Sequence, residues 1–205
     1  NSMVVELASN DGYLLKNYVE QGIGVLGIDP AHGPAAAAEK IGVETIVDFF
    51  GLELARKLKA ERGLEADVIH GNNVLAHVAD TNGFVAGIAE ILHEDGVVVI
   101  EAPSVKELIE RCAFDTIYHE HLLYLSVTSF DNLFRRHGLF ECLEGFLYGD
   151  HVGVVGGKLS GIPFLDLLHL FRGPVQRVPR RPDVSPVEPL FRAVDGACDA
   201  FQPGG

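Results

Sequence analysis

The sequence predicts an α/β fold with a doubly wound, mostly parallel sheet. Short apolar runs alternate with segments of helical apolar spacing over residues 3–103, and the links between them are short. Such alternation is typical of strand–helix–strand units with parallel strands, as in Rossmann-like domains. Apolar runs end at or near polar residues such as Glu6, Asp29 and Asn72. Because ligands of these sheets lie outside the carboxyl ends of the strands, these residues predict a binding site there.

Each element of this sheet has a local sequence signal. The first helix is expected to turn Tyr13, Leu14, Tyr18 and Val19 toward the sheet and to stop at Gly22. A turn at residues 94–96 (EDG) separates the last helix from the last parallel strand. The predicted strands are residues 3–8, 25–28, 43–47, 66–70 and 97–101, and the predicted helices are residues 12–21, 34–40, 52–62 and 81–92.

Regularity decreases after residue 103. Ser104 is expected to cap a helix that runs to Arg111, and a second helix is predicted at 129–137 with Phe130, Leu133 and Phe134 inward. Two further strands follow, at 138–143 and, antiparallel, at 152–159. Residues 1–160 are therefore expected to form the cofactor-binding domain. Residues 161–205 hold seven of the ten prolines, which indicates an irregular tail, or the remnant of a substrate region, with one short helix at 164–171.

Composition narrows the class of partner. The chain has 205 residues, 47% of them hydrophobic, and a formal net charge of −13, which argues against nucleic acid as a partner. No apolar run is long enough to cross a bilayer, and the scattered cysteines indicate neither a disulfide framework nor structural zinc. The chain starts almost inside its first strand without a signal peptide, so we expect a cut end and a cytoplasmic protein. The oligomeric state stays open, a homo-oligomer included.

The turn after the first predicted strand separates two classes of cofactor. A dinucleotide-binding turn has glycines where the backbone approaches a pyrophosphate, but here Ala8, Asn10 and Gly12 take those places. Asn10 and Asp11 add acceptors where a pyrophosphate needs N–H donors. A cofactor with a zwitterionic methionine end and a sulfonium charge tolerates this turn, and Glu6 favours its positive groups. S-Adenosylmethionine is the predicted cofactor; a different nucleotide, or no ligand, is the alternative.

Contacts with this cofactor are expected at the ends of successive strands. The methionine end is assigned to the first turn, with Glu6, Ala8, Ser9, Asn10 and Gly12. The ribose is assigned to Asp29, which Pro30 follows, and the adenine to Asp48, Phe49 and Phe50. Asn72, Asn73 and His77 are expected beside the reactive methyl group. Taken one by one, these residues also suit structural roles, Asp48 as a helix cap, Phe49 and Phe50 as core and His77 as a surface residue.

Residues 114–124 (FDTIYHEHLLY) form a second chemically dense stretch. Ionisable groups between apolar residues are costly to bury unless each is paired. His119 and His121 share a face in an extended segment and, with Glu120 or His151, suit a metal ion. Alternatively one imidazole acts as a general base, or the stretch is a hydrated loop without chemistry.

Four segments resemble one family of enzymes. Residues 5–15, 27–31, 71–78 and 114–122 are similar to the S-adenosylmethionine-dependent sugar C-methyltransferases, which methylate C-3 of nucleotide-linked 4-keto deoxyhexoses. The resemblance covers about residues 4–140, and the Tyr-His-Glu-His run at 118–121 is its most specific part. It implies a class I methyltransferase fold and a small-molecule substrate, a nucleotide sugar. The family's cysteine-rich zinc module and its second α/β region are not recognisable here.

The resemblance also implies roles for the second stretch. His121 would be the base that removes the C-3 proton, Tyr118 and Glu120 would hold the sugar and the base, and no metal would be required. Other readings stay open at this point: a small-molecule O- or N-methyltransferase, a non-catalytic cofactor-binding fragment, or, more weakly, a metal-dependent hydrolase that uses His119 and His121.

Overall fold

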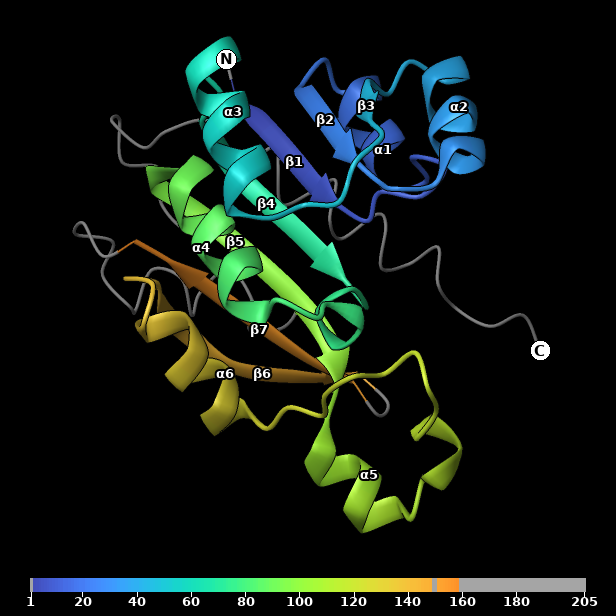
Figure 1. Ribbon diagram of the computed structural model, residues 1–205, viewed down its shortest axis with the longest axis vertical. Coiled ribbons are helices and arrows are strands. Elements are labelled where there is room, and N and C mark those ends of the chain that lie inside the picture. The colour runs from blue at the N-terminus through green and yellow to red at the C-terminus, as the bar shows by residue number, and fades with distance from the viewer. Residues whose placement is uncertain (1, 149–150, 159–205) are drawn as a thin grey trace, which may run out of the picture.

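A seven-stranded sheet forms the centre of the computed structural model, which describes residues 2–148 and 151–158 (Figure 1). The strand order is β3-β2-β1-β4-β5-β7-β6, and β1 to β5 pair in parallel while β7 is antiparallel to both of its neighbours. The strands are β1 (Met3–Leu7), β2 (Gly24–Ile28), β3 (Thr45–Ile46), β4 (Ala66–Asn72), β5 (Leu92–Pro103), β6 (Phe140–Tyr148) and β7 (His151–Gly157).

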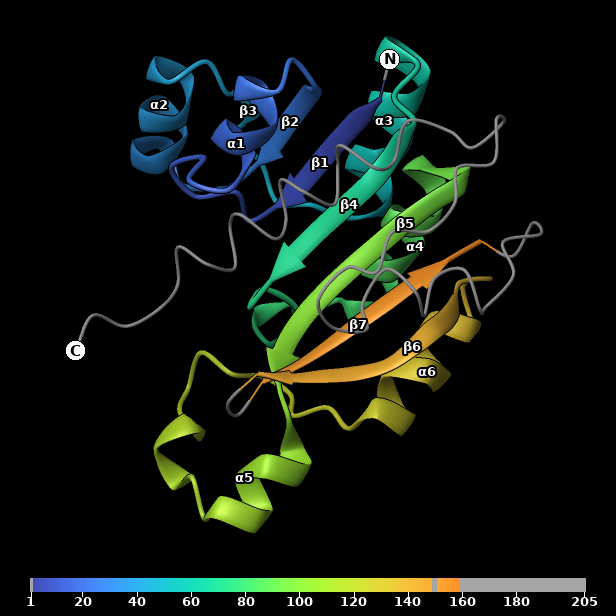
Figure 2. The same ribbon diagram turned by 180° about the vertical axis from the view of Figure 1, so that it is seen from behind.

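Helices cover both faces of the sheet, so the predicted doubly wound arrangement is confirmed (Figures 1 and 2). One face carries α1 (Leu15–Glu20) and α2 (His32–Lys40), and the other carries α3 (Leu52–Arg62), α4 (Thr81–Ile91) and α6 (Val127–Arg135). The helix α5 (Val105–Arg111) lies beyond the carboxyl end of β5. None of the helices in the described part of the chain has the length and apolar character needed to cross a bilayer.

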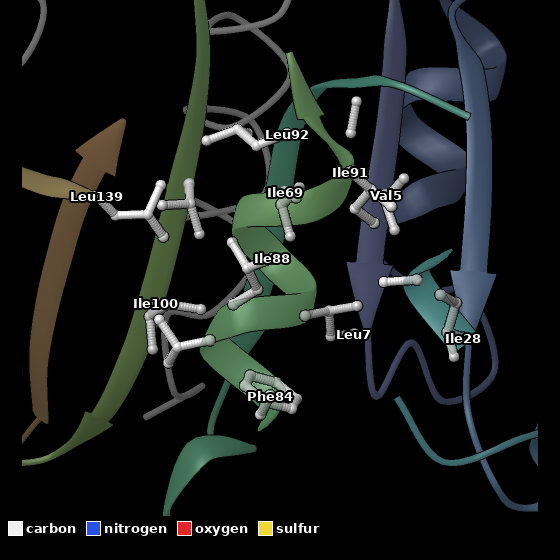
Figure 3. Close-up of a cluster of buried hydrophobic side chains, with 14 of the residues drawn as sticks. Val5, Leu7, Ile28, Ile69, Phe84, Ile88, Ile91, Leu92, Ile100 and Leu139 are labelled. Atoms are coloured by element: carbon white, nitrogen blue, oxygen red, sulfur yellow. The ribbon is translucent and has the colours of Figure 1, made fainter. Parts of the chain in front are cut away.

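Alternation along β1 divides the core into two clusters. Val5 and Leu7 face the larger cluster, in which α4 contributes Phe84, Ile88 and Ile91 (Figure 3). Val4 faces the smaller cluster, which contains Leu15 and Tyr18 of α1 among others. Successive side chains of a strand point to opposite faces, so Glu6 shares the α1 face with Val4.

Several helix boundaries differ from the sequence prediction, whereas one predicted cap is confirmed. The first helix begins at Leu15 rather than residue 12, and Tyr13 is exposed instead of packed against the sheet, whereas Leu14 and Tyr18 are buried as expected. The helix predicted at 129–137 begins at Val127, because Ser126 and Ser129 form a capping box. Ser104 caps α5 as predicted by accepting a hydrogen bond from the Glu107 N–H.

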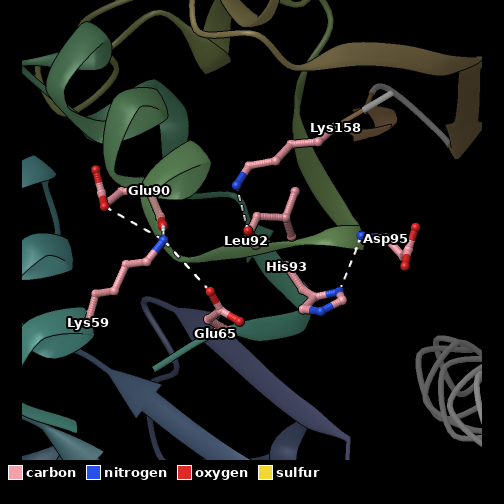
Figure 4. A network of polar contacts seen from close by, with 7 residues as sticks. All are labelled: Lys59, Glu65, Glu90, Leu92, His93, Asp95 and Lys158. Carbon is pink, nitrogen blue, oxygen red and sulfur yellow. Dashed lines mark hydrogen bonds and ion pairs between the residues drawn. The ribbon is translucent and has the colours of Figure 1, made fainter. Parts of the chain in front are cut away.

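The turn predicted at residues 94–96 is instead an irregularity inside β5. The register of β5 with β4 changes from Ala66↔Leu92 to Val68↔Val97, so three extra residues of β5 are accommodated there. Side chains brace this region: Lys59 donates to the Glu90 carbonyl at 2.7 Å and Lys158 to the Leu92 carbonyl at 2.7 Å (Figure 4). The strand therefore begins directly after α4, and the glycine-containing signal marks a bulge instead of a link.

The antiparallel strand predicted at 152–159 is confirmed as β7, and the strand predicted at 138–143 continues to Tyr148 as β6. The predicted domain boundary at residue 160, the helix at 164–171 and the proline-rich tail lie outside the described residues.

Candidate active site

The turn after β1 contains three left-handed residues at alternate positions. Ala8, Asn10 and Gly12 have φ angles of 59°, 52° and 78°. A Cβ at position 12 would also lie 3.1 Å from the Val43 side chain, which leaves glycine as the residue that fits there. Non-glycine residues in this region are strained by about 1–2 kcal/mol, and such strain is often found at functional sites.

Asp29 fastens this turn to the end of β2. Its carboxylate accepts the Asn10 N–H at 2.9 Å on one oxygen and the Ala31 N–H at 2.8 Å on the other. The side chain is buried, while Pro30 beside it is exposed. Each carboxylate oxygen has a second lone pair. Asp29 therefore shapes the turn and retains acceptor capacity for the predicted ribose contact.

Glu6 and Ser9 place buried oxygens beneath the turn. Glu6 is 1% exposed, and burial, then Asp29 and Asp11, raise the pKa of its carboxyl to about 8. Among the described residues, neither Glu6 Oε2 nor Ser9 Oγ has a hydrogen-bond partner. Ser9 fits because its neighbour on β2 is Gly27, where a Cβ would collide with the Ser9 hydroxyl.

The segment after β3 presents one free aromatic ring. Phe49 is 80% exposed, whereas Phe50 packs edge-on against Phe84 of the core with ring centroids 5.4 Å apart. Asp48 is exposed and accepts the Phe49 N–H at 2.8 Å. Of the three residues predicted to meet adenine, Phe49 and Asp48 are accessible, and Phe50 is partly buried against the core.

The ends of β4 and β5 add a polar cluster that the sequence prediction covers in part. Asn72 pairs in register with Glu101, and the Tyr13 hydroxyl hydrogen-bonds the Asn72 side chain. Asn73 is exposed with φ 52°, and its N–H donates to the Glu101 carbonyl at 2.8 Å. Tyr13 and Glu101 are new candidates. Glu101 ends a predicted strand, so the rule that selected Glu6 and Asp29 also applies to it.

The histidine-rich loop, which contains residues 114–124, leaves the sheet at the end of β5 and returns to the same place. Val105 donates to the Leu125 carbonyl at 3.1 Å, and Ser104 and Leu125 form a parallel bridge. In the middle of this excursion, the Leu122 N–H donates to the Ala76 carbonyl at 2.8 Å. Ala76 belongs to the 3₁₀ turn Leu75–His77 after β4. These contacts hold the loop over the carboxyl ends of β4 and β5.

His121 has a defined hydrogen-bonding pattern in this loop. Its Nδ1 lies 2.9 Å from the Thr116 carbonyl, and its Nε2 lies 3.3 Å from the Tyr118 hydroxyl. A carbonyl only accepts, so Nδ1 carries the proton and Nε2 is left with the lone pair. The rings of His121 and His77 meet edge-on with centroids 4.9 Å apart. The loop thus brings His121 to the exposed His77 at the end of β4.

His119 and Glu120 of the same loop are exposed to solvent. Their side chains are 89% and 60% exposed and approach each other to 4.0 Å. Among the residues whose side chains the structure describes, 2–140 and 156–158, no group of three or more His, Cys, Asp or Glu is arranged to hold a metal ion, and His151 is not among these residues. The metal-centre alternative therefore has no support from these residues.

A family model described as a methyltransferase domain matches residues 1–142. The chain belongs to this family. A curated relative, C-methyltransferase NovU from Streptomyces niveus, is 38% identical over 137 residues, which make up 67% of this chain and 32% of NovU. The methyltransferase domain described here therefore spans about a third of the length of that relative.

Solved structures share the fold of this methyltransferase domain. A TehB-like SAM-dependent methyltransferase from Corynebacterium glutamicum matches with a TM-score of 0.56 and 18% identity, over 77% of this chain and 80% of that one. A SAM-dependent methyltransferase from Archaeoglobus fulgidus matches with 0.59 and 12%, over 76% and 85%. The DhpI-SAM-HEP complex matches with 0.57 and 16%, over 76% and 78%. The predictions of a class I fold and of an S-adenosylmethionine-dependent methyltransferase domain are confirmed.

The residues at the strand ends fit the cofactor of this class. The buried, unpartnered oxygens of Glu6 and Ser9 suit a cationic amino-acid end, and Asp29 and Phe49 suit a nucleoside. The negative charges of the acidic residues at this edge disfavour a pyrophosphate. The turn after β1, which has only one of the three glycines of a dinucleotide-binding turn, gives the same indication. The assignment of each residue to a part of the cofactor stays a prediction.

Proposed function

We propose that the chain carries the cofactor-binding and base-providing part of a C-methyltransferase that acts on a nucleotide-linked keto deoxysugar through an enolate. The observation that carries this proposal is His121, whose Nδ1–H is engaged by the Thr116 carbonyl while Nε2 keeps its lone pair. The name of the 38% identical relative, C-methyltransferase, supports carbon as the acceptor atom.

His121 Nε2 removes the proton from the sugar carbon beside the ketone, and the electron pair of that C–H bond moves to the ketone oxygen as an enolate. Held by the residues at the strand ends, S-adenosylmethionine would supply the electrophilic methyl group that the enolate carbon accepts, with the neutral thioether as leaving group, and His121 would later lose its proton to solvent. Holding both reactants at one strand edge removes the cost of a bimolecular encounter.

Tyr118 has a second role in this scheme. In the structure its hydroxyl approaches His121 Nε2 at 3.3 Å. When the substrate C–H takes that place, the hydroxyl is free to donate to the developing enolate oxygen, which lowers the barrier to proton removal. Glu120 is exposed on the same loop and suits acceptance of sugar hydroxyl hydrogens.

The test is solvent deuterium exchange at sugar C-3 of a nucleotide-linked 4-keto deoxyhexose, measured by NMR with S-adenosylhomocysteine in the site, together with methyl transfer under turnover conditions. Replacing His121 by glutamine is expected to lower both rates by about 100-fold or more, because a general base typically contributes that much. His119→Gln is the matched control; its side chain is 89% exposed, and both rates should be retained.

Other outcomes assign other functions. Methyl transfer to oxygen or nitrogen without C-3 exchange would indicate a small-molecule O- or N-methyltransferase. Binding of S-adenosylhomocysteine without exchange or transfer would indicate a cofactor-binding fragment. Either result overturns the C-methylation proposal.

A further inference from the structure

The two unpartnered oxygens of Glu6 and Ser9 lie over one row of the sheet. Glu6 of β1 pairs in register with Gly27 of β2, and the Ser9 hydroxyl occupies the space that a side chain at Gly27 would fill. Glu6 is 1% and Ser9 0% exposed, so bulk solvent does not reach these two oxygens. Native proteins rarely leave such groups unpaired, and a ligand that supplies charge or hydrogen is a common reason when they do.

In the described part of the chain, the groups that interact with Glu6 supply no positive charge. Asp11 lies in the turn, Asp29 ends β2, and Tyr13 precedes α1. On β4 the register partner is His70, whose Nε2 meets the Tyr18 hydroxyl of α1 at 2.8 Å. Burial lowers the pKa of His70 to about 4, so this imidazole is neutral. The groups beside Glu6 are therefore two acids, the Tyr13 phenol and a neutral imidazole that is itself bonded to the Tyr18 hydroxyl.

We propose that Glu6 is a proton-coupled binding group, neutral in the free protein, which releases its proton to solvent when the ammonium group of the cofactor's methionine end binds at this edge. The proposal deepens the proposed function, whose cofactor is S-adenosylmethionine, and it adds a regulation by pH that the reaction itself does not require. Ionised Glu6 then balances the ammonium charge, and Ser9 offers its hydroxyl to the same group.

The size of the effect follows from simple electrostatics. A unit positive charge about 6 Å from a carboxyl, at an effective dielectric constant of about 20, lowers the carboxyl pKa by about two. From the free value of about 8, Glu6 would then titrate near 6 in the complex. We expect most of one proton to be released at pH 7, and an association constant that rises about 25-fold between pH 6 and pH 8.

The experiment is isothermal titration calorimetry with S-adenosylhomocysteine at pH 7 in phosphate and in Tris, whose ionisation enthalpies differ. The wild type should release about 0.8 proton per ligand bound. Glu6→Gln, which keeps the size of the side chain, should release none and show an affinity that does not rise with pH. Ser9→Ala is the matched control, with weaker binding but the same proton release.

A second ligand keeps the proposal testable even if Glu6→Gln does not fold. 5′-Methylthioadenosine has the nucleoside and sulfur but no ammonium group, so the wild type should bind it without proton release. Equal release with both ligands, no release with S-adenosylhomocysteine, or undiminished release in Glu6→Gln overturns the proposal. His121→Gln should release the proton as the wild type does, so a failure of C-methylation is distinguishable from a failure of this inference.

Discussion

Gly27 shows how one missing side chain shapes the cofactor turn. A Cβ at this position would collide with the Ser9 hydroxyl and lie 2.9 Å from Thr45 Oγ1. We expect Gly27→Ala to lower the free energy of unfolding by about 1–3 kcal/mol, the usual cost of overpacking, and to weaken binding of S-adenosylhomocysteine. Urea unfolding and calorimetry measure the two effects.

A matched glycine provides the control. Nothing lies within 4 Å of a Cβ added at Gly33, which is inside α2. Gly33→Ala should therefore raise the free energy of unfolding by up to about 1 kcal/mol through helix propensity and leave binding unchanged. If Gly27→Ala behaved like Gly33→Ala, Ser9 would not be held by this packing.

Ala8 is a non-glycine residue in the left-handed region of backbone conformation. Its φ of 59° strains an alanine but suits glycine. We expect Ala8→Gly to raise the free energy of unfolding by about 0.5–1 kcal/mol, because the strain relieved exceeds the added entropy of the unfolded chain. The measurement is urea unfolding, and a destabilised Ala8→Gly protein would show that packing of the Ala8 methyl group outweighs its backbone strain.

At the scale of elements, α6 anchors the return of the histidine-rich loop. Leu125, which bridges to Ser104, immediately precedes Ser126, the N-cap of α6. Ser126→Ala removes the capping box and should cost about 0.5–2 kcal/mol of folding free energy. Because the loop base loosens, methyl transfer should fall while S-adenosylhomocysteine affinity stays constant.

Thr128→Ala tests whether that effect is specific to the cap. Thr128 is exposed on the first turn of the same helix, and its replacement should change stability by less than about 0.5 kcal/mol. A loss of methyl transfer in both variants, or in neither, would show that the cap does not position the loop.

The sequence predicts those elements whose signals are local. Leu54, Ala55 and Leu58 of α3 are buried at their helical spacing, and Ser104 caps α5, because spacing and caps depend on neighbours in the chain. The bulge at 94–96 depends on pairing with β4, which no local signal contains.

The candidate site also combines features that local sequence signals predict with contacts that only the fold shows. Strand-end acids and amides are readable because parallel strands end at one edge, and this rule places Glu6, Asp29 and Asn72 together with Glu101. The contact between His121 and His77 joins residues far apart in sequence, so only the fold shows it. The resemblance indicates which histidine matters, and the structure adds the hydrogen bond that fixes its tautomer.

At the scale of the whole molecule, burying acids and imidazoles makes stability depend on pH. Two buried groups have opposite effects. The pKa of Glu6 is raised from 4.5 to about 8, so its stabilising contribution is complete below pH 4.5 and is lost as pH rises through 8. The pKa of His70 is lowered from 6.5 to about 4, so its contribution is complete above pH 6.5 and is lost as pH falls through 4.

As pH rises from 4.5 to 6.5, the two groups change the free energy of unfolding in opposite directions. Above pH 6.5 only Glu6 still changes it. We therefore expect the ligand-free protein to lose on the order of 1 kcal/mol of folding free energy between pH 6.5 and 8, since one bound proton corresponds to about 1.4 kcal/mol per pH unit. Urea unfolding at a series of pH values measures this slope. Glu6→Gln should remove it, whereas a slope that persisted in that variant would mean that another group titrates in this range.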